Sequence, residues 1–141
     1  MTSTRYLIDN SSFTRLAHNP GLREKWRKAM EDGIVGVCAL AEVEILYSAR
    51  DKAEFTEMLR DLSESFVWVM TPDRAEHRLR EVQRALVDRG AHKSAGPVDL
   101  LIAAVAELQG LTVLHYDRDF ATVARVTGQP VQWVAEPGSV D

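Results

Sequence analysis

Four carboxylates, Asp9, Glu44, Asp99 and Asp117, have the positions and the chemistry to share one divalent cation. Carboxylates gathered in one place repel one another, and at pH 7 they need a cation. A site of oxygen ligands alone, with no cysteine and no required histidine, suits Mg²⁺ or Mn²⁺ and not zinc. Magnesium usually keeps several waters and binds substrate phosphates. The residue set therefore indicates phosphodiester chemistry, in which a metal activates water and neutralises charge on the phosphate.

Two of these acids follow predicted strands. Asp9 comes directly after a short apolar strand at residues 6–8, and Asp117 lies three residues past a strand predicted at residues 111–114. Open parallel sheets bind ligands beyond the carboxyl ends of their strands, so both side chains should lie at that edge. Either residue alone has an ordinary explanation, because Asp after a strand is often a turn residue or a helix cap.

Asp99 is harder to explain in that way. It lies in the first turn of a helix predicted at residues 98–109, and the next seven residues, Leu100 to Ala106, are all apolar. Such a helix must be buried nearly all round, and an unpaired buried carboxylate costs several kcal/mol. The acid either favours the helix dipole, a contribution of about 0.3–1 kcal/mol, or is compensated by a cation. The two interpretations are compatible.

Glu42 and Glu44 both interrupt an apolar helix predicted at residues 39–49. Two residues along a helix are separated by about 200° of rotation, so these side chains face opposite ways and only one can join the other acids. Their neighbours on the helix do not decide which one it is. We expect the remaining glutamate to pair with a basic residue.

Strands and helices alternate along the whole chain. The predicted strands occupy residues 6–8, 34–37, 66–69, 111–114 and 131–133. The side chains of Asn10, Ser11 and Ser12 are predicted to cap the first helix, and Trp68, inside a strand, is predicted to lie in the core. The alternation predicts a parallel sheet covered by helices on both faces.

The composition fits one globular domain over residues 1–141. Of the 141 residues 45% are hydrophobic and 27% charged, and the formal net charge is −4. A nucleic-acid binder that relies on bulk charge would be basic, so any polyanion must be held by local patches or by metal. The single cysteine, Cys38, allows no disulfide within the chain. No apolar run approaches the roughly 20 residues that span a bilayer and no signal-peptide pattern opens the chain, so we expect a cytoplasmic protein without a membrane partner.

Two segments of the first half resemble motifs of a known family. Tyr-Leu-Ile-Asp9-Asn-Ser11-Ser resembles an opening strand followed by Asp-Thr-Ser, with Asn10 in place of the usual Thr. The segment that ends at Arg50 resembles Glu-Leu-x-Tyr-Gly-Ala-Arg, and counting back from the Gly position places the family's glutamate at Glu44.

Two segments of the second half resemble motifs of the same family. Pro-Val-Asp99-Leu-Leu-Ile-Ala-Ala resembles its Asp-x-x-Ile-Ala-Ala helix, and Leu-His-Tyr-Asp117-Arg-Asp119-Phe resembles its Thr-x-Asp-x-Asp-Phe segment. Taken together, the four motifs cover nearly the whole chain. In this order and spacing they resemble the PIN-domain ribonucleases, and specifically the VapC toxins of bacterial type II toxin–antitoxin pairs.

The resemblance implies a PIN-like three-layer α/β/α sandwich with a short central parallel sheet. It also implies an Mg²⁺- or Mn²⁺-dependent endoribonuclease that cleaves RNA and slows translation, usually as a homodimer. A cognate VapB-like antitoxin would neutralise it, with the antitoxin's C-terminal tail crossing the active-site groove. By position, Asp9, Asp99 and Asp117 would be the principal metal ligands, and Glu44 would complete the catalytic acidic pocket.

Further residues are candidates for auxiliary roles. The resemblance makes Asp119 an auxiliary metal ligand and gives Ser11 a hydrogen bond within the site. Arg89, His92 and Lys93 belong to a basic stretch that runs into the loop before the helix of Asp99. This stretch either contacts the RNA backbone, since Arg and Lys supply most phosphate contacts, or is a solvated helix face balanced by nearby acids.

Three aromatic side chains have both a functional and a structural explanation. His115 could touch substrate, and Trp26 and Trp133 could stack on bases. Packing is the commoner fate of a single tryptophan. For His115 we favour a structural histidine whose hydrogen bonds are satisfied.

Two other functions compete with a nuclease. A non-catalytic PIN-like module would bind RNA or an antitoxin without cutting, and a lost acid would mark it, but none is missing here. A phosphotransfer receiver or a phosphatase would need a lysine near the phosphate site or an Asp-x-Asp nucleophile after the first strand. The first strand here is followed by Asp9-Asn10-Ser11, and no lysine follows a later strand.

Overall fold

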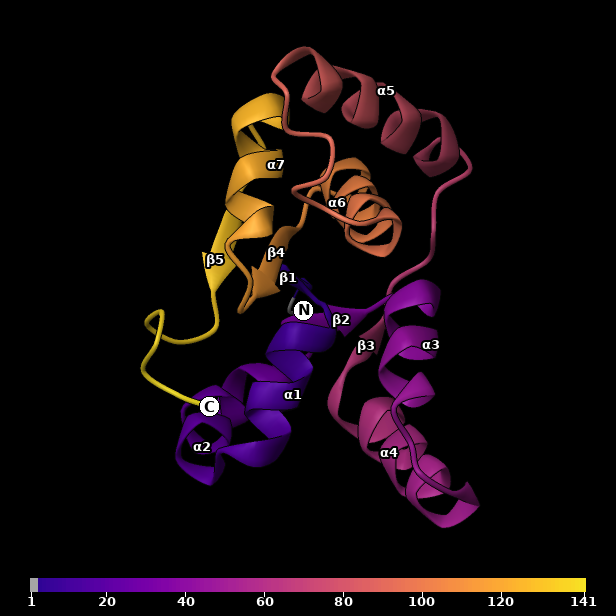
Figure 1. Ribbon diagram of the computed structural model, residues 1–141. Coiled ribbons are helices and arrows are strands. Elements are labelled where there is room, and N and C mark those ends of the chain that lie inside the picture. The colour runs from indigo at the N-terminus through magenta and orange to yellow at the C-terminus, as the bar shows by residue number, and fades with distance from the viewer. Residues whose placement is uncertain (1–2) are drawn as a thin grey trace.

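The computed structural model describes residues 3–141, with helices on both faces of a five-stranded parallel sheet (Figure 1). Met1 and Thr2, which begin the stretch leading into the first strand, lie outside the described residues. The elements in chain order are β1 Tyr6–Ile8, α1 Asn10–His18, α2 Pro20–Glu31, β2 Val35–Val37, α3 Ala39–Tyr47, α4 Lys52–Ser65, β3 Val67–Trp68, α5 Ala75–Asp88, α6 Pro97–Gln109, β4 Thr112–His115, α7 Asp119–Thr127 and β5 Val131–Trp133. The predicted alternation of strands and helices is confirmed.

The order of the strands places β1 at the centre of the sheet. The order is β3-β2-β1-β4-β5, and every neighbouring pair is parallel. The chain builds the sheet outward from β1 in one direction through β2 and β3, and then in the other through β4 and β5. In open α/β sheets the crevice at such a reversal, beyond the carboxyl ends of the strands, is where ligands bind.

Helix α6 lies in the middle of the helical layer that covers one face of the sheet (Figure 1). It lies over the sheet with α5 and α7 outside it, while α1 and α2 cover the opposite face (Figure 1). Residues Leu100 and 102–106 are buried, as the apolar run predicts. Pro97 occupies the first turn of α6, and Gly110, with φ 70°, ends it in the left-handed conformation that glycine adopts without strain. No helix within residues 3–141 has the length and apolarity needed to cross a membrane.

The prediction for Trp68 is wrong. Its side chain is 56% exposed, because β3 is two residues long and stands at the edge of the sheet. The apolar run at residues 66–69 contributes only Phe66 and Val69 to the core. An apolar run is typical of a fully buried strand, but whether a strand is central or at an edge depends on pairing with distant segments.

Candidate metal centre

Two neighbouring strands end together at the edge where the acids gather. Ile8 of β1 pairs with Leu114 of β4, so Asp9 and the turn containing Asp117 leave the sheet side by side. Helix α6 begins nearby with Pro97, which puts Asp99 in its first turn, and α3 carries Glu44 one turn before its end. Segments far apart in the sequence therefore bring all four predicted acids to the same crevice.

Asp9 is held by the start of α1 and is almost completely buried, with 2% of its surface exposed. Its side chain accepts hydrogen bonds from the Ser12 amide at 3.0 Å and from Ser11 Oγ at 2.8 Å. Ser12 Oγ in turn accepts from the Asp9 amide at 3.2 Å, which completes a capping box. Burial raises the pKa of Asp9, and these hydrogen bonds oppose the rise.

The cap of α1 corrects one prediction. Asp9 itself is the N-cap, whereas Asn10, Ser11 and Ser12 already belong to the helix. Asp9 has extended backbone angles (φ −118°, ψ −176°), as an N-cap requires. The helix therefore starts immediately after β1, and the acid at the strand end has a structural task as well as its place in the crevice.

Three aspartates present oxygens at the spacing that a cation needs. One carboxylate oxygen each of Asp99, Asp117 and Asp119 lies within 4.8 Å of the others. Asp119 is the first residue of α7, and its amide donates to Asp117 Oδ1 at 2.9 Å, which fixes the two acids relative to one another. An all-carboxylate set of this kind fits a hard divalent cation.

The charges in this crevice are not balanced by basic side chains. None of the ion pairs within residues 3–141 includes Asp9, Glu44, Asp99, Asp117 or Asp119. Burial, and then the charges of Asp9, Asp117, Glu44 and Asp119 in that order, raise the pKa of Asp99 to about 7. Burial and the charge of Asp117 likewise raise the pKa of Asp119, and the charge of Arg118 opposes the rise. Such a group of acids is stabilised when a cation neutralises it.

Of the two glutamates of α3, Glu44 is the one whose charge acts on the other acids. Burial and the charge of Asp9 raise the pKa of Glu44, and Glu44 in turn contributes to the raised pKa of Asp99. Its carboxylate therefore faces the crevice. Glu42, two residues earlier, is turned about 200° away, and within residues 3–141 it forms no ion pair, contrary to the expectation that the remaining glutamate would find a basic partner.

The turn between β4 and α7 is held by side-chain acceptors. The Tyr116 amide donates to Ser11 Oγ at 2.8 Å, and Ser11 Oγ also contacts Asp9, so one hydroxyl links both strand ends. The Asp117 amide donates to His115 Nδ1 at 3.1 Å. Ser11 thus has the predicted hydrogen bond within the site.

His115 differs from its prediction in one respect. The side chain is fully buried, as a structural histidine should be, and burial lowers its pKa to about 4 against the charge of Asp117. Its Nε2, however, has no hydrogen-bond partner within residues 3–141. The expectation of a fully satisfied histidine is therefore wrong for one nitrogen. The sequence contained a signal for this contact, because His115 is a side-chain acceptor two residues before the amide of Asp117.

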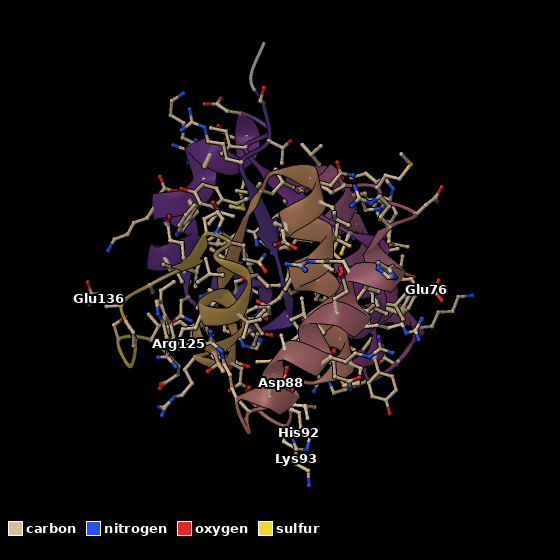
Figure 2. The ribbon with its side chains drawn as sticks, turned by 90° about the horizontal axis from the view of Figure 1, so that it is seen from above. Glu76, Asp88, His92, Lys93, Arg125 and Glu136 are labelled. Carbon is tan, nitrogen blue, oxygen red and sulfur yellow. The ribbon has the colours of Figure 1, made fainter. Side chains whose placement is uncertain are left out.

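The basic stretch lies outside the crevice. Arg89 ends α5, and His92 and Lys93 follow in the loop that leads to α6. All three are exposed. In Figure 2, His92 and Lys93 project at the end of the molecule opposite the N-terminal trace, which is the end where the parallel strands finish. None of the three forms an ion pair with the clustered acids among residues 3–141.

The two partly buried tryptophans are used in packing. Trp26 donates from Nε1 to the Val134 carbonyl and packs edge-on against Tyr6. Trp133 packs against His115 and Tyr116. Both rings are therefore engaged in packing, the commoner fate expected for a single tryptophan.

A groove of about 1120 Å³ is lined by residues of α1, α2, α4 and the segment between α3 and α4, and none of the five clustered acids is among its lining residues. Phe13 and Met58 supply apolar lining, and Arg23, Arg50 and Glu57 supply charge. Asn10, directly after Asp9, and Ser48, one helical turn after Glu44, also line it. The groove therefore adjoins, in sequence, the residues that follow Asp9 and Glu44.

The sequence over residues 6–126 matches the PIN domain family. This chain belongs to that family. Among curated PIN proteins, Ribonuclease VapC21 of Mycobacterium tuberculosis is 41% identical over 97% of this chain and 99% of its own length, and Ribonuclease VapC2 of the same organism is 43% identical over 94% of each. The resemblance seen in the four motifs is confirmed.

The fold of this PIN chain recurs in solved structures. VapBC from Salmonella typhimurium, crystallised with DNA, gives a TM-score of 0.75 at 18% identity over 94% of this chain and 100% of that one. VapBC2 from Rickettsia felis, bound to a fragment of promoter DNA, gives 0.77 at 13% identity over 92% and 98%. At these identities the likeness establishes the fold, and the predicted PIN-like α/β/α sandwich is confirmed.

Proposed function

We propose that this chain is the ribonuclease toxin of a toxin–antitoxin pair, a metal-dependent endoribonuclease that cleaves RNA and thereby inhibits translation. The observation that carries the proposal is the convergence of five carboxylates, without a basic partner among residues 3–141, on the carboxyl edge of the sheet. The names of the relatives, which are ribonucleases matched over nearly their whole length, support the choice of RNA as substrate.

The acids have distinct places around the proposed cation, Mg²⁺ or Mn²⁺. Asp99, Asp117 and Asp119 offer oxygens to a shared point, and Asp9 approaches from β1. When bound, the cation supplies Lewis-acid stabilisation of the phosphate and lowers the pKa of a bound water. Ser11 keeps Asp9 oriented by its hydrogen bond, and Glu44 completes the acidic pocket from α3.

We assign the contact with the RNA backbone to Arg89, His92 and Lys93. Their exposure beside the acid-lined edge suits phosphate binding, and the net charge of −4 means that attraction must be local. Replacing Arg89 and Lys93 by Ala should raise KM and leave kcat unchanged. Replacing Lys25, an exposed residue of α2 on the other face of the sheet, is the matched control and should change neither. Equal KM values in all variants would make this stretch an ordinary solvated face.

We assign the groove beside α4 to the C-terminal tail of a VapB-like antitoxin. The solved neighbours are VapBC proteins, and the groove offers apolar and charged lining that includes Asn10, directly after Asp9. We assign homodimerisation to the exposed apolar side chains of α3, Val43 and Tyr47, which are 61% and 91% exposed. Burying such side chains between two copies is favourable.

Cleavage of RNA by the purified chain, with and without metal, tests the proposal. The protein should cut RNA with Mg²⁺ or Mn²⁺, stop when EDTA is added, and recover when metal is returned in excess. Sequencing of RNA ends after brief expression should reveal the target. Cleavage that survives EDTA would overturn the metal site, and tight RNA or antitoxin binding without any cleavage would favour the non-catalytic module.

A further inference from the structure

Burying the imidazole of His115 at its position lowers the stability of the fold. The ring is fully buried between Phe120 and Trp133, with centroid distances of 5.2 and 5.0 Å. An apolar side chain would fill such a slot without polar atoms, whereas the Nε2–H of His115 is buried without a partner among residues 3–141. An unsatisfied buried donor destabilises a fold. The histidine must therefore contribute something that a leucine would not.

That contribution is the acceptor Nδ1. It accepts the Asp117 amide at 3.1 Å, and a neutral imidazole accepts at one nitrogen only, so the ring proton is on Nε2. A side-chain acceptor that binds the amide two residues later closes a tight turn, as asparagine does in Asx turns. The ring thus shapes the chain at the point where it leaves β4.

Each of the three side-chain acceptors along this turn binds a different backbone amide. Tyr116 N–H is bound by Ser11, Asp117 N–H by His115, and Asp119 N–H by Asp117 Oδ1. Without Nδ1, the amide of Asp117 would lose this acceptor, and the carboxylate oxygens of Asp117 and Asp119 are acceptors in the same turn. A carboxylate lone pair used in that way would not face the point shared by Asp99, Asp117 and Asp119.

We propose that His115 is a positioning residue of the acid cluster, which holds the Asp117 amide so that the carboxylates of Asp117 and Asp119 stay turned toward Asp99. The inference deepens the proposed function, because it rests on a cation being bound by these acids. His115 touches neither substrate nor cation in this role.

Three variants separate positioning from packing. His115→Leu fills the buried space with an apolar side chain and removes both ring nitrogens. His115→Asn keeps an acceptor where Nδ1 stands, and His115→Gln moves the amide group toward the place of Nε2. Binding of Mn²⁺ alone, measured by titration calorimetry, and the thermal midpoint of the metal-free protein are the two readouts, so no RNA is needed.

We expect opposite responses from the two readouts. His115→Leu should unfold at the wild-type temperature or above it, because the unsatisfied donor is gone, yet bind Mn²⁺ roughly 10–100-fold more weakly, the range for partners that orient metal ligands. His115→Asn should bind Mn²⁺ within about threefold of wild type, and His115→Gln should resemble the leucine variant.

The outcomes distinguish this inference from the proposed function. Wild-type affinity in His115→Leu, or equal affinities in the Asn and Gln variants if the Leu variant does not fold, overturns the positioning role and leaves the metal site intact. Absence of Mn²⁺ binding by the wild-type protein, with Asp99→Asn as the matched blank, overturns the metal site and this inference with it.

Discussion

Helix α6 carries two acids with opposite surroundings. Glu107, near the end of α6, accepts two hydrogen bonds from Arg78 of α5, with Nε–Oε1 and Nη2–Oε2 distances of 2.6 and 3.0 Å. Asp99, in its first turn, faces four other carboxylates and forms no ion pair within residues 3–141. A bidentate pair with arginine supports the packing of α5 on α6. A group of like charges opposes folding, and such departures from local stability are typical of functional sites.

The largest effect should come from Asp99→Asn. We expect RNA cleavage to fall by roughly 10²–10³-fold, because a preorganised charge at the reacting phosphate is lost. The metal-free protein should become more stable, since like-charge repulsion is reduced. Initial rates on labelled RNA and urea unfolding in EDTA measure the two quantities.

The matched control for Asp99→Asn is the same exchange of acid for amide on the same helix, Glu107→Gln. It should leave cleavage unchanged and lower the stability by about 1–2 kcal/mol, because the Arg78 guanidinium loses its bidentate carboxylate partner and keeps only the longer contact with Glu81. If both variants lose activity equally, or both lose stability equally, the contrast between the two ends of α6 is wrong.

The pH dependence of the metal-free protein comes next. The folded-state pKa of Asp99 is about 7, above its ordinary 3.8, so folding favours the protonated acid. This contribution to stability is fully present below pH 4 and is lost as the pH rises to 7 and beyond. The thermal midpoint in EDTA should therefore fall between pH 5 and pH 8, with a smaller fall in Asp99→Asn.

Adding Mn²⁺ gives that pH series an internal control. The cation should raise the thermal midpoint more at pH 8 than at pH 5, because ionised acids bind it better. A midpoint of the metal-free protein that rises from pH 5 to pH 8 would contradict the assignment of Asp99 as a destabilising charge.

A smaller effect should separate the two glutamates of α3. Glu44→Gln should lower cleavage about tenfold, the lower end of what losing a partner of a metal ligand costs. Glu42→Gln, on the other side of the same helix, should have no effect, and relative kcat values measure both. Loss of activity in Glu42→Gln alone would mean that the rotation of α3 has been misassigned.

The smallest effects concern the arginines that pair with acids. Arg78→Ala should destabilise the protein by about 1–2 kcal/mol through its broken pair with Glu107. Arg27→Ala should produce no measurable shift of the thermal midpoint, because its partners Glu24 and Glu31 are exposed on the same helix. If Arg27→Ala lowered the thermal midpoint as much as Arg78→Ala, the burial of an ion pair would not explain how much it stabilises the protein.

The sequence was informative wherever the evidence is local. The strand that ends before Asp9 and the apolar helix that begins around Asp99 both follow from hydrophobic pattern, and the gathering of acids follows from the geometry of parallel sheets. The choice between Glu42 and Glu44 needed the rotation of α3 against α6. That rotation is set by packing between distant segments, which neighbouring residues do not encode.

The errors have the same origin. Four consecutive residues from Asp9 to Ser12 are all good caps, and the end of β1, fixed by its pairing with β4, selects the first of them. Trp68 lies in an apolar run, but the order of the strands puts it at an edge. The unpaired nitrogen of His115 arises because Phe120 and Trp133 close over the ring from other elements.

The double task of Asp9 matters for the design of an inactive form of this protein. Replacing Asp9 by Ala would remove the cap of α1 together with the charge, so a lost complex could not be told from a damaged fold. Asp99 caps nothing, and its amide replacement relieves a strained neighbourhood. Asp99→Asn, at the start of α6, is therefore the inactive and stably folded variant to use for co-crystallisation with a ligand of the proposed site.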